Sequence, residues 1–295
     1  MTKRIITALV LFVIVIASLF AGADVFYFVM ALAFMCALYE WLVLAQLSKA
    51  HAALIALVDF TLLGSLCVLV HNTAGGPGGE SALIHIIPTL LAGFFLIVVC
   101  FWLCESVKIF RGRSTGFTVP YKRSVVLGII AVPGAWLAFY LIAELFDLIF
   151  VFSVLCVVWI ADIMALFSGM AFGRHKMCTA ISPKKTWEGA LGGFLSVLII
   201  GTLAGYFYEG STLPRYVMDF LGFFGWFFVS FALVAFSITG DLFESVLKRQ
   251  AGVKDSGRIL PGHGGFFDRL DAMMPALPLA LVLCIAVAYI GYPGY

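Results

Sequence analysis

Acidic side chains gather in two groups on either side of a polar stretch near the C-terminal end of the chain. Asp241, Glu244 and Lys248 are spaced so that a helix would place all three on one face. Asp268 and Asp271 lie three residues apart at the expected start of the next helix, whose N-terminus favours ionised carboxylates. Oxygen ligands without a His or Cys cluster suit Mg²⁺ better than zinc. The two groups therefore predict a magnesium-dependent site.

The polar stretch that follows the first group and ends with the second, residues 245–271, is rich in basic side chains that could hold phosphates. A metal, charge neutralisation and positioning are what phosphoryl transfer requires. A simple preference for basic residues on one side of a membrane would explain the cations. It would not explain the residues threaded between them, which are Gly257, Pro261, Gly262, Gly264 and Gly265.

Two other polar features lie outside this stretch. Residues 182–189 place hydroxyls and two lysines before a predicted helix start, where phosphate can bind, although Pro183 and Gly189 are also ordinary helix-boundary residues. Asp162 lies deep in an apolar run, where a carboxylate costs roughly 2.5–3.5 kcal/mol and usually serves function. Its alternative role is a structural hydrogen bond to a neighbouring helix. Asp59 is a similar case with less support.

The elements that must position these residues are membrane helices. The chain is 63% hydrophobic and only 12% charged, whereas soluble domains carry about 25% charged residues. A bilayer core needs about 20 apolar residues per helix. That length predicts an all-α polytopic fold with about nine spans, at residues 4–21, 24–46, 52–71, 83–104, 122–142, 146–171, 188–208, 217–240 and 272–291.

The basic residues predict the orientation of these spans. Of 18 Lys and Arg residues, all except Arg215 fall in loops on one side of the nine-span arrangement, which predicts a cytoplasmic N-terminus and an outside C-terminus. The first span, with Lys3 and Arg4 before it, is expected to be an uncleaved anchor rather than a signal peptide. We expect an N-terminal transmembrane region, 1–120, and a catalytic region, 121–295, with cytoplasmic loops 172–187 and 241–271.

Several other classes of site find no support. The seven cysteines form no CxxC pair and indicate neither zinc nor a disulfide framework. Neither a Walker A motif nor GxGxxG is present, so soluble nucleotide-binding folds are not indicated.

Residues 245–271 fill every fixed position of a known signature and resemble the phosphatidate cytidylyltransferase (CDP-diacylglycerol synthase) family. Residues 182–189, together with Gly240, Asp241 and Glu244, match upstream, and the resemblance extends over about residues 155–290. The signature positions are Ser245, Lys248, Arg249, Lys254, Asp255, Gly257, Pro261, His263, Gly264, Gly265, Asp268, Arg269 and Asp271.

The resemblance implies that CTP and phosphatidate react to give CDP-diacylglycerol and pyrophosphate. It also implies Mg²⁺, with room for a second, monovalent cation, a homodimer, and a multi-pass place in a bacterial-type inner membrane without nucleic-acid partners. Carried over position by position, Asp241, Asp268 and Asp271 would bind the metal and, with Lys248 and Arg249, act in catalysis; Asp162 and Glu244 are secondary candidates. The implied substrate-binding residues are Ser182, Lys184, Lys185, Thr186, Lys254, Arg258, His263 and Arg269.

One departure from the family pattern leaves room for a different lipid. The family usually has Thr or Ser after the membrane Asp and a Tyr shortly beyond, whereas Ile163 follows Asp162 here and Leu166 or Phe167 stands near the Tyr position. The alternatives are a related CTP-dependent enzyme, such as a polyprenol kinase or an ether-lipid CDP synthase, and a secondary transporter with Asp59 and Asp162 as ion sites. The transporter is disfavoured because no repeat relates the two halves.

Overall fold

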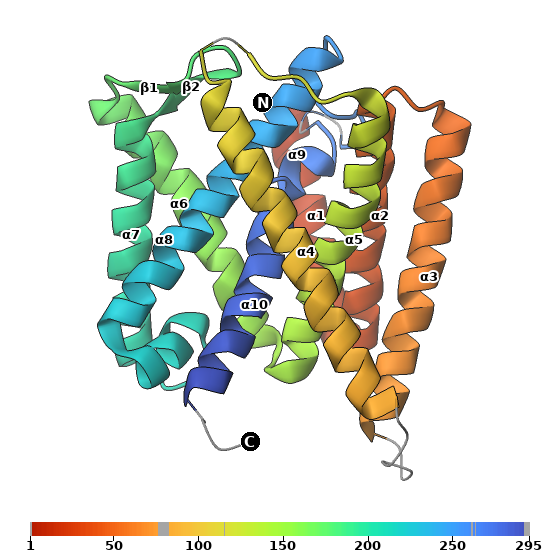
Figure 1. Ribbon diagram of the computed structural model, residues 1–295, viewed down its shortest axis with the longest axis vertical. Coiled ribbons are helices and arrows are strands. Elements are labelled where there is room, and N and C mark those ends of the chain that lie inside the picture. The colour runs from red at the N-terminus through yellow and green to blue at the C-terminus, as the bar shows by residue number, and fades with distance from the viewer. Residues whose placement is uncertain (1, 76–82, 115, 261, 263, 292–295) are drawn as a thin grey trace. The chain divides into compact units, whose positions relative to one another are not determined.

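The computed structural model describes residues 2–75, 83–114, 116–260, 262 and 264–291, and these are mostly helical (Figure 1). A two-stranded antiparallel sheet interrupts the helices along the chain, with β1 at Lys176–Cys178 and β2 at Ser182–Thr186. The helices are α1 (Thr2–Ala21), α2 (Ala23–Leu44), α3 (Lys49–Gly75), α4 (Leu83–Arg111), α5 (Tyr121–Leu145), α6 (Leu148–Phe172), α7 (Trp187–Phe207), α8 (Leu213–Gln250), α9 (Phe267–Leu270) and α10 (Met273–Gly291).

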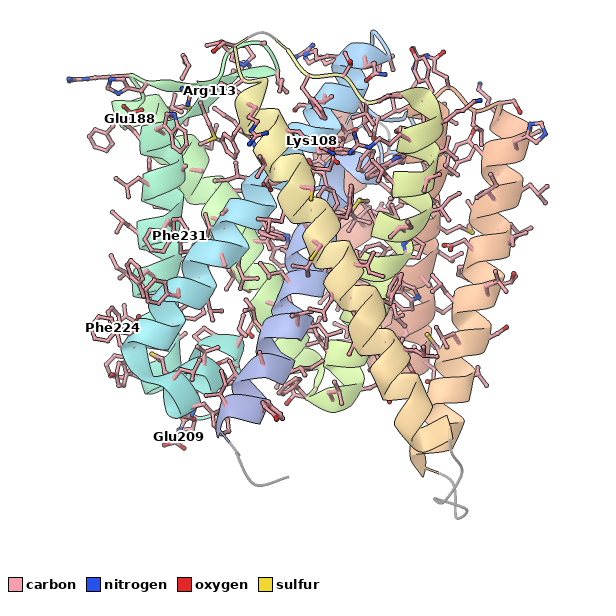
Figure 2. All side chains as sticks on the ribbon, viewed as in Figure 1. Lys108, Arg113, Glu188, Glu209, Phe224 and Phe231 are labelled. Carbon is pink, nitrogen blue, oxygen red and sulfur yellow. The ribbon has the colours of Figure 1, made fainter. Side chains whose placement is uncertain are left out.

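Eight helices among the described residues are long and apolar enough to cross a membrane, and Leu9–Ala21 of α1 is a shorter apolar helix. Figure 2 shows how side chains suit this setting along α7 and α8. Phe224 and Phe231, which are 77% and 56% exposed, lie between Glu188 near one end and Glu209 near the other. Exposed aromatic side chains at mid-height match a lipid environment. The predicted helical, multi-pass membrane fold is confirmed; the orientation of its termini stays a prediction.

The chain divides into two compact units, which we describe separately. Unit 1 comprises Met1–Leu91, Thr118–Leu137 and Val246–Asp271, and unit 2 comprises Ala92–Phe117, Ala138–Ser245 and Ala272–Tyr295. The boundary between the units falls within α4, α5 and α8. The predicted division into an N-terminal transmembrane region, 1–120, and a catalytic region, 121–295, is a functional one and stays a prediction.

Trp41 near the end of α2 organises the polar end of unit 1. Its indole is fully buried and its Nε1 donates to the Ser124 carbonyl of α5 at 2.9 Å. Its ring stacks on Phe267 of α9, with the ring centroids 4.9 Å apart. A buried Trp needs a hydrogen-bond acceptor for its N–H, and this one finds it in the backbone. The same side chain therefore ties α9 to α2 and α5.

Glycines let α6 and α7 pack closely in unit 2. A Cβ added at Gly189 or Gly193 would lie 2.7 or 2.6 Å from the carbonyl oxygens of Ala165 or Ala161. The two glycines are four residues apart and face α6, as small residues do where membrane helices approach closely. This contact holds the C-terminal half of α6 beside the start of α7, where the predicted phosphate-binding segment lies.

Two predicted loops differ from the structure. The loop predicted at 241–271 is helical up to Gln250, because neither Gly nor Pro occurs from Asp241 to that residue. The helix ends where Gly252 takes a φ of +70° and its N–H bonds back to the Arg249 carbonyl at 3.1 Å. The loop predicted at 172–187 is mostly the β1–β2 hairpin. Asp241 and Glu244 therefore lie inside a helix rather than at its end.

Candidate active site

A cavity of about 550 Å³ lies within unit 2 between α6, the hairpin, the start of α7 and α8. It falls within the size range of small-molecule sites. Its walls bring together residues predicted from three separate parts of the sequence. The polar residues that line it are Asp162, Asp241, Lys176, Lys184, Lys185 and Thr186.

An ion pair joins the hairpin to α8 in this cavity. Lys185 Nζ donates a hydrogen bond to Asp241 Oδ2, and both side chains are about three-quarters buried. Asp162 lies in the field of both charges, and its Oδ1 accepts from Ser237 Oγ at 3.4 Å. Asp162, a secondary candidate from the sequence, thus lines the same cavity as Asp241, a primary candidate. Two carboxylates beside lysines suit a ligand that carries phosphate and a divalent cation.

The same cavity also has an apolar side. Ala165, Leu166, Met170 and Ile238 contribute to its lining. Leu166 and Met170 are 61% and 67% exposed, although both belong to the membrane helix α6. The cavity therefore joins a cationic wall to an apolar wall that is open at its surface, an arrangement that fits an amphipathic ligand.

Local hydrogen bonds hold the hairpin against α7. Thr186 is the N-cap residue of α7, and its Oγ1 accepts from the Gly189 N–H at 3.1 Å. Glu188 accepts from the backbone N–H groups of Arg174 and His175 and contacts His175 Nδ1 at 2.6 Å. Thr186 was predicted to bind substrate; in the structure it caps the helix and also lines the cavity.

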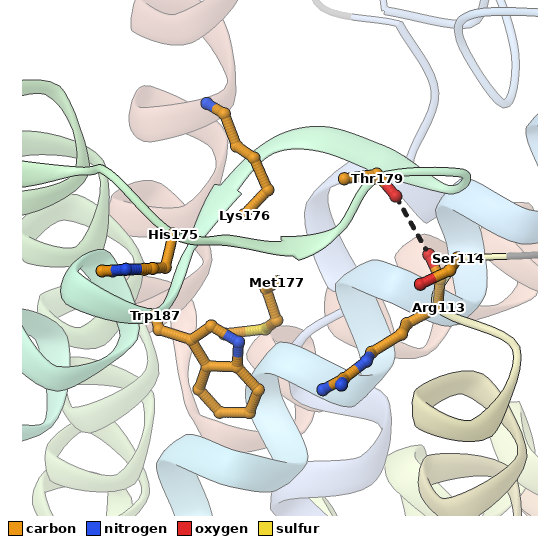
Figure 3. Close-up of a pocket in the computed structure, with 7 residues that line it drawn as sticks. All are labelled: Arg113, Ser114, His175, Lys176, Met177, Thr179 and Trp187. Carbon is orange, nitrogen blue, oxygen red and sulfur yellow. Dashed lines mark hydrogen bonds between the residues drawn. The ribbon is translucent and has the colours of Figure 1, made fainter.

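A second cavity, of about 470 Å³, also borders the hairpin and is lined by Arg113, Ser114, His175, Lys176, Met177, Thr179 and Trp187 (Figure 3). Thr179 Oγ1 donates to the Arg113 carbonyl at 3.5 Å and connects the hairpin to the segment after α4. Figure 3 shows Lys176 pointing away from Met177 and Trp187, as alternate residues of a strand do. Lys176 lines both cavities.

Asp268 of unit 1 is held by hydrogen bonds through both of its carboxylate oxygens. Its Oδ2 accepts hydrogen bonds from the N–H groups of Ser256 and Gly265 and from Ser256 Oγ, each at 2.8 Å. Its Oδ1 accepts from Lys248 Nζ at 2.7 Å. These contacts fix the rotamer of Asp268 and leave Oδ1, shared with the lysine, as the oxygen best placed for a ligand.

The glycines of the signature have a steric role around Asp268. Gly264 has a φ of +84°, and a Cβ at this position would lie 2.5 Å from Asp268 Oδ2. Any other residue would therefore be strained there and would also displace the carboxylate. The backbone closes with an N–H···O bond from Leu260 to Gly264 at 3.0 Å. Gly264, one of the glycines that a simple preference for basic loops left unexplained, is thus required by the packing around Asp268.

Sequence reasoning missed Glu40, a 2% exposed residue of α2. Its Oε2 accepts from the Phe267 N–H at 2.9 Å and from Ser256 Oγ at 3.2 Å. A signal was available, because an acid inside an apolar span is functional by default. Asp59 borders a small cavity of unit 1, lined otherwise by apolar residues.

The structure brings the remaining predicted residues together only in part. Asp271 and Glu244 are buried, and Ser182 is not among the described residues that line the 550 Å³ cavity. His263 lies outside the described residues. The predicted basic residues whose side chains are exposed in unit 1 are Arg249, Lys254, Arg258 and Arg269.

The predicted metal ligands belong to both units, with Asp241 in unit 2 and Asp268 and Asp271 in unit 1. Within the described ranges, no group of three or more His, Cys, Asp or Glu side chains is arranged to hold a metal. Mg²⁺ commonly takes only one or two protein carboxylates and completes its shell with water and phosphate oxygens. The carboxylates of Asp241 and Asp162, which line one cavity, fit this mode of Mg²⁺ binding. A single ion shared by all three acids stays a prediction.

These features define a class of protein: a multi-pass helical membrane protein with acidic and basic side chains beside an amphipathic cavity. Comparison with known sequences agrees and is more specific. The sequence model of the cytidylyltransferase family matches residues 2–287. The chain belongs to this family and is a nucleotidyltransferase.

Two similar proteins match nearly the whole chain, and a third matches less than half of it. A phosphatidate cytidylyltransferase of Haemophilus influenzae is 32% identical over 94% of this chain and 96% of its own length. The Pseudomonas aeruginosa protein of that name is 33% identical over 97% of this chain and 98% of its own. One from Staphylococcus aureus (strain COL) is 44% identical over 44% of this chain and 46% of its own.

Proposed function

We propose that this chain is a CTP:phosphatidate cytidylyltransferase that makes CDP-diacylglycerol and pyrophosphate at the cytoplasmic face of a bacterial inner membrane. The observation that carries the proposal is the 550 Å³ cavity, which joins Asp241 and the lysines of the hairpin to the apolar side chains of α6. A lipid with a phosphate head group presents the same two chemistries side by side. The near full-length similarity to bacterial proteins of that name supports the choice of substrates.

The reaction needs positioning and charge neutralisation more than proton transfer. An oxygen of the phosphatidate phosphate forms a bond to the α-phosphorus of CTP. The bond from that phosphorus to the bridging oxygen of the β-phosphate breaks, and pyrophosphate leaves with the electron pair. The attacking phosphate oxygen is already anionic, so no strong general base is required. Lys176, Lys184 and Lys185 offset the repulsion between the two anionic substrates.

Mg²⁺ would be held by Asp241, with Asp162 in the same cavity, and would supply further neutralisation of the triphosphate. The chain's own contribution is to keep Asp241 charged and oriented, which the Lys185 hydrogen bond does. In unit 1, Lys248 and the backbone N–H groups orient Asp268 in the same way. The homodimer and the second, monovalent cation stay predictions.

Product analysis of the purified protein tests the proposal. The full-length chain in detergent is given α-labelled CTP and phosphatidate, with and without Mg²⁺. We expect labelled CDP-diacylglycerol and an equal amount of pyrophosphate, only when Mg²⁺ is present. Release of CDP with phosphorylation of a polyprenol would show a kinase instead. Turnover of an ether analogue of phosphatidate in preference to phosphatidate would change the lipid assignment.

A further inference from the structure

Glu40 contacts four residues around Asp268 that are distant from it in the sequence, which are Ser256, Gly257, Gly265 and Phe267. The Phe267 N–H donates to Glu40 Oε2 at 2.9 Å, at the start of α9. The hydroxyl of Ser256 lies 3.2 Å from the same oxygen and 2.8 Å from Asp268 Oδ2. A hydroxyl carries one proton, so it can donate to only one of the two carboxylates at a time. Ser256 therefore links the two acids through one shared proton, with the shorter contact to Asp268, and the Phe267 N–H is the other donor to Glu40.

The signature glycines leave the space that Glu40 occupies. A Cβ added at Gly257 would collide with Oε1, and a Cβ added at Gly265 would collide with Oε2. The two glycines thus lie against the two oxygens of a single carboxylate. A carboxylate is costly to bury unless it is hydrogen-bonded, as Glu40 is. The cost makes sense if Glu40 sets the conformation of residues 255–268.

Glu40 and Asp268 are linked through two short routes. Ser256 contacts both carboxylates through its hydroxyl, and its N–H donates to Asp268 at 2.8 Å. Phe267, which Glu40 binds through its N–H, immediately precedes Asp268 and stacks on Trp41, the neighbour of Glu40 in α2. Displacement of Glu40 would therefore release both the hydroxyl and the helix turn that aim Asp268.

We infer that Glu40 is a positioning residue of the reaction: it holds Ser256 and the first turn of α9 so that Asp268 presents Oδ1 beside Lys248. This inference rests on the proposed function for its catalytic meaning, while its structural content concerns unit 1 alone. Glu40 touches neither substrate nor reacting atoms and acts through Asp268.

The amide variant separates the shape of the side chain from its charge. The carbonyl oxygen of the glutamine in Glu40→Gln can take the place of Oε2 and still accept from Phe267 and Ser256. Its amide then lies where Oε1 lies, an oxygen with no hydrogen-bond partner among the described residues. Glu40→Ala removes the carboxylate that accepts from the Phe267 N–H and the Ser256 hydroxyl. The matched control is Asp24→Ala, which removes an exposed acid from α2 itself.

Two measurements are made on the full-length variants in detergent. The first is amide hydrogen exchange of peptides that cover residues 252–270. The second is the Mg²⁺ concentration that gives half-maximal CDP-diacylglycerol synthesis, together with kcat. Loss of a partner that orients a metal-binding side chain costs about 10- to 100-fold in metal affinity or activity. Glu40→Ala is expected to speed exchange in this segment and to raise the half-saturating Mg²⁺ concentration by about that factor.

Glu40→Gln is expected to stay within about threefold of the wild type in both measurements, because the acceptor is kept. Asp24→Ala should match the wild type. The inference is overturned if Glu40→Ala exchanges like the wild type in residues 252–270, or if it loses activity only in proportion to lost folded protein at an unchanged half-saturating Mg²⁺. If the wild-type chain makes no CDP-diacylglycerol, the proposed function fails, and the exchange data alone decide the role of Glu40.

Discussion

Lys248 Nζ lies 2.7 Å from Asp268 Oδ1 and joins the last turns of α8 to the short helix α9. The two side chains are only 15% and 12% exposed, so the ion pair compensates two largely buried charges. The residues are 20 positions apart. Lys248, near the start of the signature, therefore meets Asp268, near its end. This ion pair explains why the signature contains both residues.

Replacement of Lys248 by Met should therefore affect both stability and activity. Removal of one partner from a buried ion pair leaves the other charge uncompensated and typically costs about 3–5 kcal/mol. We expect a clearly lower unfolding temperature and a loss of CDP-diacylglycerol synthesis of at least about tenfold. Lys49→Met, which removes an exposed lysine of unit 1, should change neither quantity. Equal effects of the two substitutions would contradict the importance of the pair.

The Lys185–Asp241 ion pair predicts strong coupling between two substitutions in unit 2. Groups in direct contact show interaction energies of about 0.5–3 kcal/mol in double-mutant cycles. Lys185→Ala and Asp241→Asn should each reduce kcat/KM, and the double variant should be less impaired than the product of the two single effects predicts. The cycle is measured with CTP and phosphatidate at saturating Mg²⁺. Independent, multiplying effects would show that the two side chains act separately.

The close approach of α6 and α7 predicts that Gly193→Ala is destabilising. The new methyl would lie 2.6 Å from the Ala161 carbonyl oxygen, so the helices must move apart. Overpacking of this kind typically costs about 1–3 kcal/mol. Gly64→Ala in α3 is the control, because its added Cβ meets nothing within 4 Å, and it should gain up to about 1 kcal/mol from helix propensity. Thermal unfolding in detergent compares them; a stabilised Gly193→Ala would refute the packing argument.

Cys178 of β1 should react slowly with thiol reagents near neutral pH. Burial raises the pKa of its thiol, and the nearby charges of Lys185 and Arg113 offset this only in part. The thiolate is the reactive form, so its fraction at a given pH falls when the pKa rises. Labelling by a maleimide should increase only at a pH above that of an ordinary cysteine. Two chains are compared, one with Cys178 as its single cysteine and one with Ser114→Cys as its single cysteine. Position 114 is exposed and lies in the same unit. Equal rates at pH 7 would contradict the prediction.

The sequence by itself determined the class of the protein and most of its chemistry. Long apolar runs dictate membrane helices, because backbone polar groups in lipid must be satisfied within a helix. The signature residues 245–271 and 182–189 pointed to the reaction, since their residue types and spacing are specific to one family. Asp241, Lys184 and Lys185 could be proposed for one site on those grounds alone, and the structure places all three around one cavity.

Only the tertiary structure showed how these residues are held. The pairing of Lys185 with Asp241, and the presence of Asp162 in the same cavity, depend on the packing of α6, α7 and α8. Glu40 is more than 200 positions from the residues that it contacts, and nothing local in the sequence relates them. Local patterns report helices and motifs, whereas contacts between distant segments depend on how side chains fill space. For that reason Gly257 and Gly265 became intelligible only once Glu40 was seen to lie against them.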